Sequence, residues 1–186
     1  MQNKKPVIFW LITAAVVVLL VSLIVVAPVA AATGHTEVAA GIYHAFSPLC
    51  HQRADRSYFI AGYQFAVCSR CTGVYAGFAL TLLLYPFVRS LKSTLMPPRA
   101  VLLLAALPLA IDFSVTFFGF WENTHTSRLL TGALLGSVTV FYVMPGIVEL
   151  SLRKSRTARP KAMFTLASPD AIASAPSDYS APERRI

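Results

Sequence analysis

Three cysteines lie close together in this chain, and their spacing is typical of sites that bind thiophilic metals. Cys50 is followed directly by His51, and Cys68 and Cys71 form a C-x-x-C pair seventeen residues beyond that histidine. Thiolate sulfur and imidazole nitrogen are ready ligands for zinc-like ions, and a C-x-x-C pair places two ligands in one tight turn. The same thiols could instead carry out disulfide chemistry.

The segments that position these cysteines are apolar enough to cross a membrane. Of the 186 residues, 56% are hydrophobic and 13% are charged, and a helix needs roughly 20 apolar residues to span a bilayer. Four such runs occur, at 7–27, 72–88, 100–121 and 129–148. The sequence therefore predicts an all-α polytopic membrane protein: a first transmembrane helix (1–32), a cysteine-rich loop (33–71), three further transmembrane helices (72–152) and a disordered basic tail (153–186).

The first apolar run is longer than the core of a secretory signal peptide, which favours a retained membrane anchor over a cleaved leader. Lysine and arginine then set the orientation, because cytoplasmic flanks carry their excess. One side of the predicted bundle has ten of these charges, at Lys4, Lys5, Arg89, Lys92, Arg99, Arg153, Lys154, Arg156, Arg159 and Lys161. The other side has Arg53, Arg56, Arg70 and Arg128. We expect a multi-pass protein of the cell (inner) membrane with both termini cytoplasmic and the cysteine loop on the extracytoplasmic side.

A metal would explain how three cysteines persist in that compartment. Unprotected thiols there tend to oxidise, and three cannot all pair within one chain, whereas a bound metal keeps each thiolate occupied. Cys50, Cys68 and Cys71 are the expected ligands of zinc or a similar divalent ion. His51, His125 and Asp112 are the candidates for a fourth ligand.

Ionisable residues near the membrane form a second group. Asp112 lies eight or nine residues from the predicted end of the third span, about 12 Å deep, so it needs a cationic partner such as Arg70, Arg128 or the metal. Asp112, Arg70 and Arg128 are candidates for a catalytic role, although a purely structural tie between helices is an equal alternative. Arg53 and Arg56 could hold an anionic lipid or lipid carrier, because guanidinium groups pair with phosphate and carboxylate. Ion pairs with local carboxylates would explain the same arginines without a ligand.

Weaker patterns predict how the loop and the spans pack. Apolar residues at helical spacing indicate a short interfacial helix over 38–49, and two aromatic-rich segments flanking Ala61-Gly62 suggest a small hairpin that returns Cys68 towards Cys50. Thr72-Gly73 with Gly77 matches Thr131-Gly132 with Gly136 at an offset of 59 residues. Glycines four residues apart let helices approach closely, so the second and fourth spans should meet.

The combined motif resembles the "domain of unknown function 2085" family of predicted prokaryotic membrane proteins. The resemblance rests on 50–53 (CHQR), Arg56-Ser57, 68–73 (CSRCTG), Asp112 and Arg128 with Thr131-Gly132, and runs from about Leu49 to Gly136. The family pattern has glycine after the aspartate, where this chain has Phe113. The resemblance groups these residues but implies no activity.

Three functions remain open, and the sequence does not decide whether the protein is an enzyme. The first is a membrane metalloprotein that binds or acts on an anionic lipid-like ligand. The second is a membrane thiol-disulfide oxidoreductase using Cys68 and Cys71 with Cys50, with a quinone as cofactor. The third is a non-enzymatic structural or lipid-binding protein. The bilayer is a partner in each case and an oligomer is compatible with all three, whereas the positive charge follows from membrane orientation and does not indicate nucleic acid.

Overall fold

Four long helices carry the apolar runs of the sequence. The structure, a computed structural model, describes residues 5–157, with side chains through residue 150. The long helices are α1 (Lys5–Ala32), α3 (Ser69–Val88), α4 (Arg99–Phe117) and α5 (His125–Thr157). Each is long and apolar enough to cross a membrane, α5 over His125–Leu150. The predicted all-α fold with four candidate spans is confirmed. From residue 158 onward, the predicted tail lies outside the described residues.

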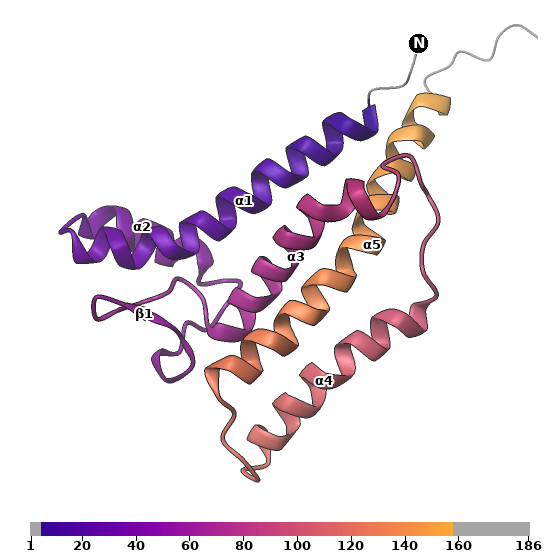
Figure 1. Ribbon diagram of the computed structural model, residues 1–186. Coiled ribbons are helices and arrows are strands. Elements are labelled where there is room, and N and C mark those ends of the chain that lie inside the picture. The colour runs from indigo at the N-terminus through magenta and orange to yellow at the C-terminus, as the bar shows by residue number, and fades with distance from the viewer. Residues whose placement is uncertain (1–4, 158–186) are drawn as a thin grey trace, which may run out of the picture. The chain divides into compact units, whose positions relative to one another are not determined.

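Helices α3 and α5 lie between α1 and α4 (Figure 1) and run parallel in direct backbone contact. A methyl group at Gly73 would overlap the carbonyl of Leu129, and one at Gly136 would overlap the carbonyl of Val74. Gly77 and Gly132 are equally close to the opposite helix. The predicted meeting of the second and fourth spans is confirmed, because only glycine leaves room for two helix backbones at this distance.

Helix α1 packs against this pair through a buried cluster at the end of the bundle where α1 begins. Ala14 of α1 lies there with Leu82 and Tyr85 of α3 and Met144 of α5, and the cluster is completed by Val140. The Trp10 indole N–H donates to the carbonyl of Leu82 at 2.8 Å. We call the opposite end, where α1 ends and both α3 and α5 begin, the cysteine end.

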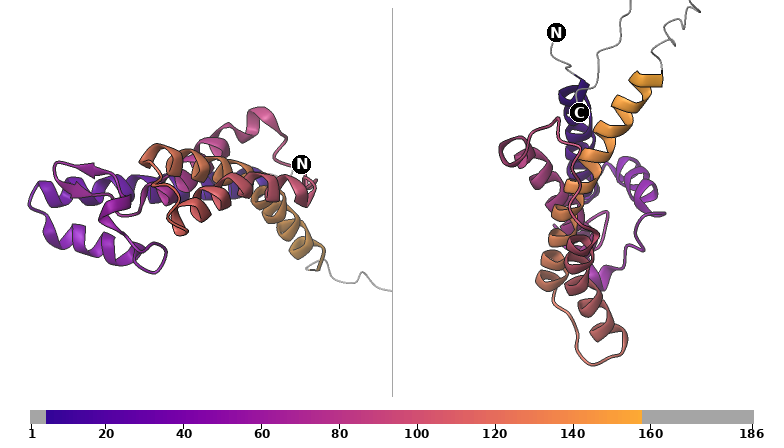
Figure 2. Two further views of the ribbon diagram at one scale, coloured as in Figure 1. Left: turned by 90° about the horizontal axis from the view of Figure 1, so that it is seen from below. Right: turned by 90° about the vertical axis from the view of Figure 1, so that its right-hand side faces the viewer.

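A small helix and a hairpin fill the connection from α1 to α3 at the cysteine end. Helix α2 (Thr36–Phe46) lies beside the last turns of α1 (Figure 2), a short 3-10 turn follows at Ala54–Arg56, and β1 (Phe59–Ile60) pairs antiparallel with β2 (Tyr63–Gln64). Both turn residues of the hairpin have positive φ, 49° at Ala61 and 83° at Gly62, the conformation of a tight type I′ turn. A short helix and a hairpin are both present as predicted from sequence, although the helix spans Thr36–Phe46 rather than 38–49.

Pro28 provides the attachment point for this connection on α1. A proline has no N–H, so the carbonyl of Ile24 lacks the donor that the helix would otherwise supply four residues later. The backbone N–H of Ala66 donates to that carbonyl at 3.3 Å, and Ala66 and Val67 are fully buried beneath it. The chain is therefore fixed against α1 immediately before Cys68.

Helix α4 ends four residues earlier than the sequence suggested. The predicted run to Trp121 is wrong because Gly119 adopts a φ of 73° and closes a C-terminal cap, with Phe120 N–H donating to the carbonyl of Val115. Asp112 is consequently five residues from the helix end, about 8 Å along the axis rather than the expected 12 Å.

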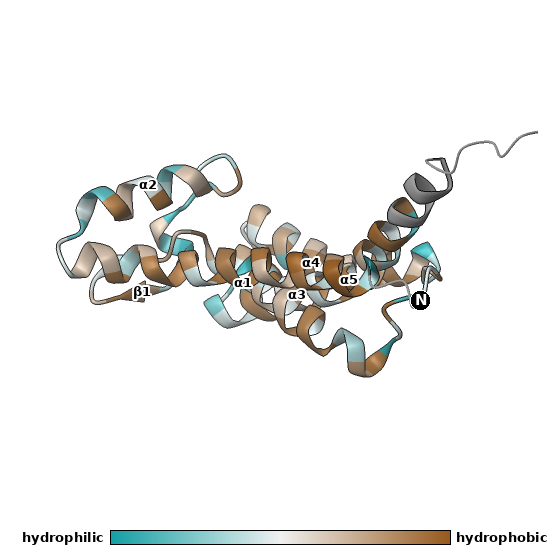
Figure 3. Ribbon diagram, turned by 90° about the horizontal axis from the view of Figure 1, so that it is seen from above, coloured by the Kyte–Doolittle hydropathy of each residue, from teal (hydrophilic) through white to brown (hydrophobic). Residues whose placement is uncertain are grey.

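Apolar residues cover the long helices and polar residues gather at their ends and on α2 (Figure 3).

Candidate metal centre and its arginine cavity

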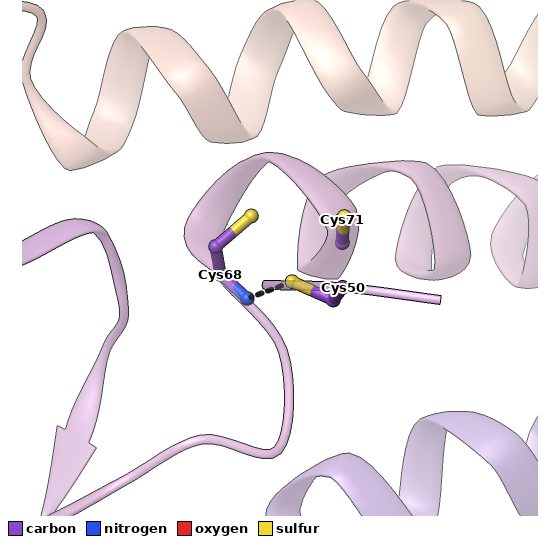
Figure 4. Close-up of side chains that lie close together, drawn as sticks. All are labelled: Cys50, Cys68 and Cys71. Carbon is purple, nitrogen blue, oxygen red and sulfur yellow. Dashed lines mark hydrogen bonds between the residues drawn. The ribbon is translucent and has the colours of Figure 1, made fainter. Parts of the chain in front are cut away.

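The three cysteines meet at the start of α3. Their sulfur atoms all lie within 4.8 Å of one another, and Figure 4 shows Cys50 facing the first turn of the helix. Cys68 is the N-cap residue and Cys71 lies in the first turn, so the C-x-x-C spacing places both side chains at the same helix end. The positive end of the helix dipole there favours thiolate over thiol. The predicted convergence of the three sulfurs is confirmed.

Backbone N–H groups are directed at the sulfur of Cys50. Gln52 has a φ of 49°, a left-handed conformation that turns its N–H back to Cys50 Sγ at 3.5 Å, and Cys68 N–H donates to the same sulfur at 3.3 Å. The pKa of the Cys50 thiol is held well below its usual range, first by hydrogen bonds from the Cys68 and Cys71 side chains and then by these backbone donors. These hydrogen bonds therefore favour the thiolate form of Cys50.

The Gln52 side chain holds the cysteine loop together, a role that the sequence reasoning missed. Its Nε2 donates to the carbonyl of Tyr43 at 2.7 Å and to the carbonyl of Ala66 at 2.8 Å. Gln64 Nε2 donates in turn to the carbonyl of Gln52 at 3.2 Å. These bonds connect α2, the Cys50 segment and the strand that leads to Cys68. The one sequence signal was the position of the glutamine inside the CHQR motif.

The donor set fits a thiophilic divalent metal. With zinc–sulfur bonds of about 2.3 Å, sulfurs at tetrahedral positions are about 3.8 Å apart, so separations within 4.8 Å require little movement. No imidazole nitrogen or carboxylate oxygen of the described residues belongs to this group of donor atoms. The site therefore offers three sulfur ligands and leaves a fourth position for another donor.

The three residues proposed as fourth ligands lie in different surroundings. His51 is exposed and lines the same cavity as the sulfurs. His125 is the first residue of α5, and its Nδ1 lies 2.8 Å from the hydroxyl of Ser69 while its ring packs against Tyr58. The carboxylate of Asp112 pairs with Arg70. Among the described residues, the side chain of His51 is thus the one of the three without a hydrogen bond or ion pair to another part of the site, and it is the nearest in sequence to a sulfur ligand.

Asp112 and Arg70 form an ion pair that joins α4 to α3. Arg70 Nη2 lies 2.5 Å from Asp112 Oδ2, and the two side chains are 19% and 8% exposed. The guanidinium also lies over the ring of Phe113, 5.7 Å from its centroid. Phe113 thus packs against the arginine from the position where the family resemblance led us to expect glycine. Asn123 donates to the backbone carbonyl of Asp112 and anchors the loop that follows α4.

A cavity of about 380 Å³ opens directly beside the sulfurs. All four arginines that the sequence placed at this end line it, together with Leu49, Cys50, His51, Gln52, Cys68, Cys71 and Phe113. Arg53 and Arg56 share Asp55 in exposed ion pairs of 3.1 and 3.3 Å, and hydrogen bonding from Arg53 lowers the pKa of that carboxylate. Arg128 differs from them because it is buried, at 7% exposed.

Four apolar helices with a thiol site and an arginine-lined cavity at one end define a polytopic membrane protein with a polar site at the end of its bundle. The chain belongs to the family described as "Predicted membrane protein (DUF2085)", whose model matches residues 50–142. The resemblance noted from the CHQR and CSRCTG motifs is thereby confirmed.

Two archaeal relatives support this membership. "Uncharacterized protein MJ1492" of Methanocaldococcus jannaschii is 35% identical over 113 residues, which cover 61% of this chain and 72% of that protein. An "Uncharacterized protein" of Methanothermobacter thermautotrophicus is 37% identical over 91 residues, 49% of this chain and 80% of that one. No solved structure matches the chain.

Proposed function

We propose that this protein is a membrane metalloprotein that binds zinc or a similar divalent ion through Cys50, Cys68 and Cys71. The observation that carries the proposal is the approach of three sulfurs to within 4.8 Å, one of them receiving two backbone N–H groups. Donors of this kind stabilise a thiolate whether or not a metal is bound, and a metal requires its cysteines in that form. Three sulfurs around one ion also account for an odd number of cysteines.

His51 is the protein side chain that we propose as fourth ligand. It adjoins Cys50 and lines the cavity, whereas His125 and Asp112 each have a partner elsewhere. A His51 ligand would close the coordination sphere and make the site structural. A water or a ligand oxygen in its place would leave the metal able to lower the pKa of bound water or to polarise that ligand.

We propose the cell (inner) membrane as the location, with both termini cytoplasmic. The four candidate spans of the described residues are an even number, which places the two ends of the chain on one side, and the excess of lysine and arginine beside those ends favours the cytoplasm. The cysteine end then faces the extracytoplasmic side, where a metal would protect the thiols from oxidation. A fluorescent protein fused after residue 186 should fluoresce, and alkaline phosphatase fused at the same point should be inactive; the reverse pattern contradicts the orientation.

The cavity beside the sulfurs is the proposed place for an anionic, lipid-like ligand. Four arginines supply the charge, and the exposed side chains of Leu49 and Phe113 supply apolar surface at its wall. Whether the protein transforms this ligand or only binds it depends on the fourth position of the metal. Asp112, Arg70 and Arg128 are the proposed groups for any chemistry there, since the first two form a charged pair at the cavity and the third is buried beside them.

Metal analysis with thiol counting tests the proposal. Full-length protein purified in detergent should contain about one zinc-like ion per chain, and Cys68→Ser or Cys71→Ser should lose it. His51→Ala should weaken metal binding, with His44→Ala, an exposed histidine on α2, as the matched control. Metal-free protein with a reducible Cys68–Cys71 disulfide would overturn the proposal and support a membrane thiol-disulfide oxidoreductase instead.

A further inference from the structure

Arg128 is a largely buried cation that forms no direct ion pair with any described residue. It is 7% exposed at the start of α5, and its guanidinium forms no hydrogen bond or ion pair within residues 5–157. Removing a charge from water costs several kcal/mol unless a partner of opposite charge replaces the lost hydration. A guanidinium also presents five donors that must be satisfied in such a place. Asp112 and Asp55 act on Arg128 without a direct contact, so an anion held in the cavity would be its first direct partner among the groups around it.

The groups around Arg128 do not provide that partner. Arg56 and Arg70 line the same two neighbouring cavities as Arg128, the larger of about 380 Å³ and the smaller of about 50 Å³. Asp112 is paired with Arg70, and Asp55 is shared between Arg56 and Arg53 in exposed contacts. Both local carboxylates, Asp55 and Asp112, are thus already in ion pairs with other arginines. The arginines that line these cavities outnumber the two carboxylates.

Arg70 adds a second unsatisfied donor at the same point. Its Nη2 binds Asp112, but its Nε is buried and has no hydrogen-bond partner among the described residues. Planar guanidinium groups bind tetrahedral and planar oxyanions through paired N–H donors, and phosphate accepts several such donors at once. Two incompletely paired arginines at adjoining cavities are what a phosphate group would satisfy.

The walls of the cavities indicate how such a phosphate would arrive. Phe113 contacts both cavities and Phe117 the smaller one, while Leu49 lines the larger; all three side chains are about half exposed or more. In a membrane, apolar side chains at the mouth of a charged site suit a ligand with a charged head and an apolar tail. A soluble anion would need no such surface.

We propose that Arg128, with Arg56 and Arg70, binds the phosphate group of a lipid at the cysteine end of the bundle. A lipid phosphate is a more specific ligand for the cavity of the proposed function. Only the presence of a metal beside that phosphate depends on the proposed function. The three sulfurs line the same cavity as Arg128, so a phosphate held there lies beside the proposed metal site. Arg128 is the central contact because its side chain is largely buried, lines both cavities and forms no ion pair among the described residues.

Equilibrium binding to the detergent-solubilised, full-length protein tests this proposal. The probes are inorganic phosphate and short-chain phosphatidic acid, with short-chain diacylglycerol as a competitor that lacks the phosphate group. We expect Arg128→Gln to weaken phosphatidic acid binding at least tenfold. Arg99→Gln, the same change at an exposed arginine at the far end of the bundle, should remain within twofold of wild type. If phosphatidic acid binds tightly and inorganic phosphate binds weakly, the ligand is a lipid. If both bind equally, the ligand is free phosphate.

Several outcomes decide against the proposal. It is overturned if wild type binds neither probe, if it binds inorganic phosphate as tightly as phosphatidic acid, if Arg128→Gln and Arg99→Gln bind alike, or if diacylglycerol competes as well as phosphatidic acid. Should Arg128→Gln fail to fold, Arg128→Lys and Arg56→Gln give the same test, with a several-fold loss expected from each. Metal content is measured on the same samples: metal without phosphate binding refutes this inference alone, whereas phosphate binding without metal refutes the proposed metal site alone.

Discussion

Replacing Gln52 by alanine should loosen the cysteine loop and weaken metal binding without touching a ligand. The substitution removes the two hydrogen bonds from Nε2 to the carbonyls of Tyr43 and Ala66. Each such bond stabilises a folded protein by about 1 kcal/mol net, so the loop loses about 2 kcal/mol. Alanine and glutamine both carry a Cβ, so the strain of the left-handed backbone at this position stays the same.

The expected effect on metal affinity follows from what this side chain positions. Gln52 N–H is bonded to Cys50 Sγ, and its side chain fixes the segment against the strand that leads to Cys68. Loss of a group that orients metal ligands commonly weakens metal affinity about 10- to 100-fold. We expect the lower part of that range, because the Cys68 N–H bond to the same sulfur remains.

A competition titration with a chromophoric zinc chelator measures the affinity, and thermal unfolding in detergent measures the stability. Gln64→Ala is the graded control, since it removes a single side-chain bond of 3.2 Å while Tyr43 still donates to the Gln64 carbonyl. It should lower affinity less than Gln52→Ala does. Wild-type zinc affinity and an unchanged unfolding midpoint in Gln52→Ala would refute the assignment of Gln52 as the residue that holds the loop.

Three further substitutions test the fold around the site. Gly77→Ala places a methyl group against the α5 backbone and should destabilise the protein by about 1 to 3 kcal/mol in denaturant unfolding, whereas Gly41→Ala, with open space around it, should be neutral or stabilising. Asp112→Asn leaves Arg70 without its anion and should cost up to about 3 kcal/mol in the same assay; an unchanged midpoint would show that this ion pair contributes nothing. Ala61→Asn suits the positive φ of its turn and should raise the thermal midpoint by a degree or more, a result that a lowered midpoint would contradict.

Much of this arrangement could be predicted from sequence, because its signals are local or periodic. Uninterrupted apolar runs identify the four spans, glycines at four-residue spacing identify the face where α3 meets α5, and Ala61-Gly62 identifies the hairpin turn. The grouping of the cysteines follows from the same hairpin. Each of these features depends on residues that are neighbours in the chain or one helical turn apart.

The contacts that were not predicted join segments that are distant in sequence. Nothing local in Pro28 indicates that the carbonyl it leaves free accepts the N–H of Ala66. Gln52 could have bonded to any exposed carbonyl, and its partners exist only once α2 and the hairpin are packed. Asp112 had several cationic candidates, and only the packed helices show that Arg70 is the one that reaches its carboxylate.

Charge connects the proposed metal to the proposed phosphate site. Four arginines and two carboxylates leave the cavity region with two positive charges, and a divalent ion held by three thiolates contributes one negative charge. A metal-loaded site therefore keeps a net charge near +1, which one singly ionised phosphate group would neutralise. Metal removal followed by protonation of the thiols would raise that charge to +2, so by charge alone the stripped protein should bind phosphatidic acid more tightly.

Coordination of a phosphate oxygen at the fourth position of the metal would produce the opposite result. We expect the effect of charge to dominate, because His51, the proposed fourth ligand, would leave the metal no position for a phosphate oxygen. Stripping the metal with a chelator should then tighten phosphatidic acid binding, and restoring zinc should reverse the change. Weaker binding by the stripped protein would mean that a phosphate oxygen, and not His51, occupies the fourth position of the metal.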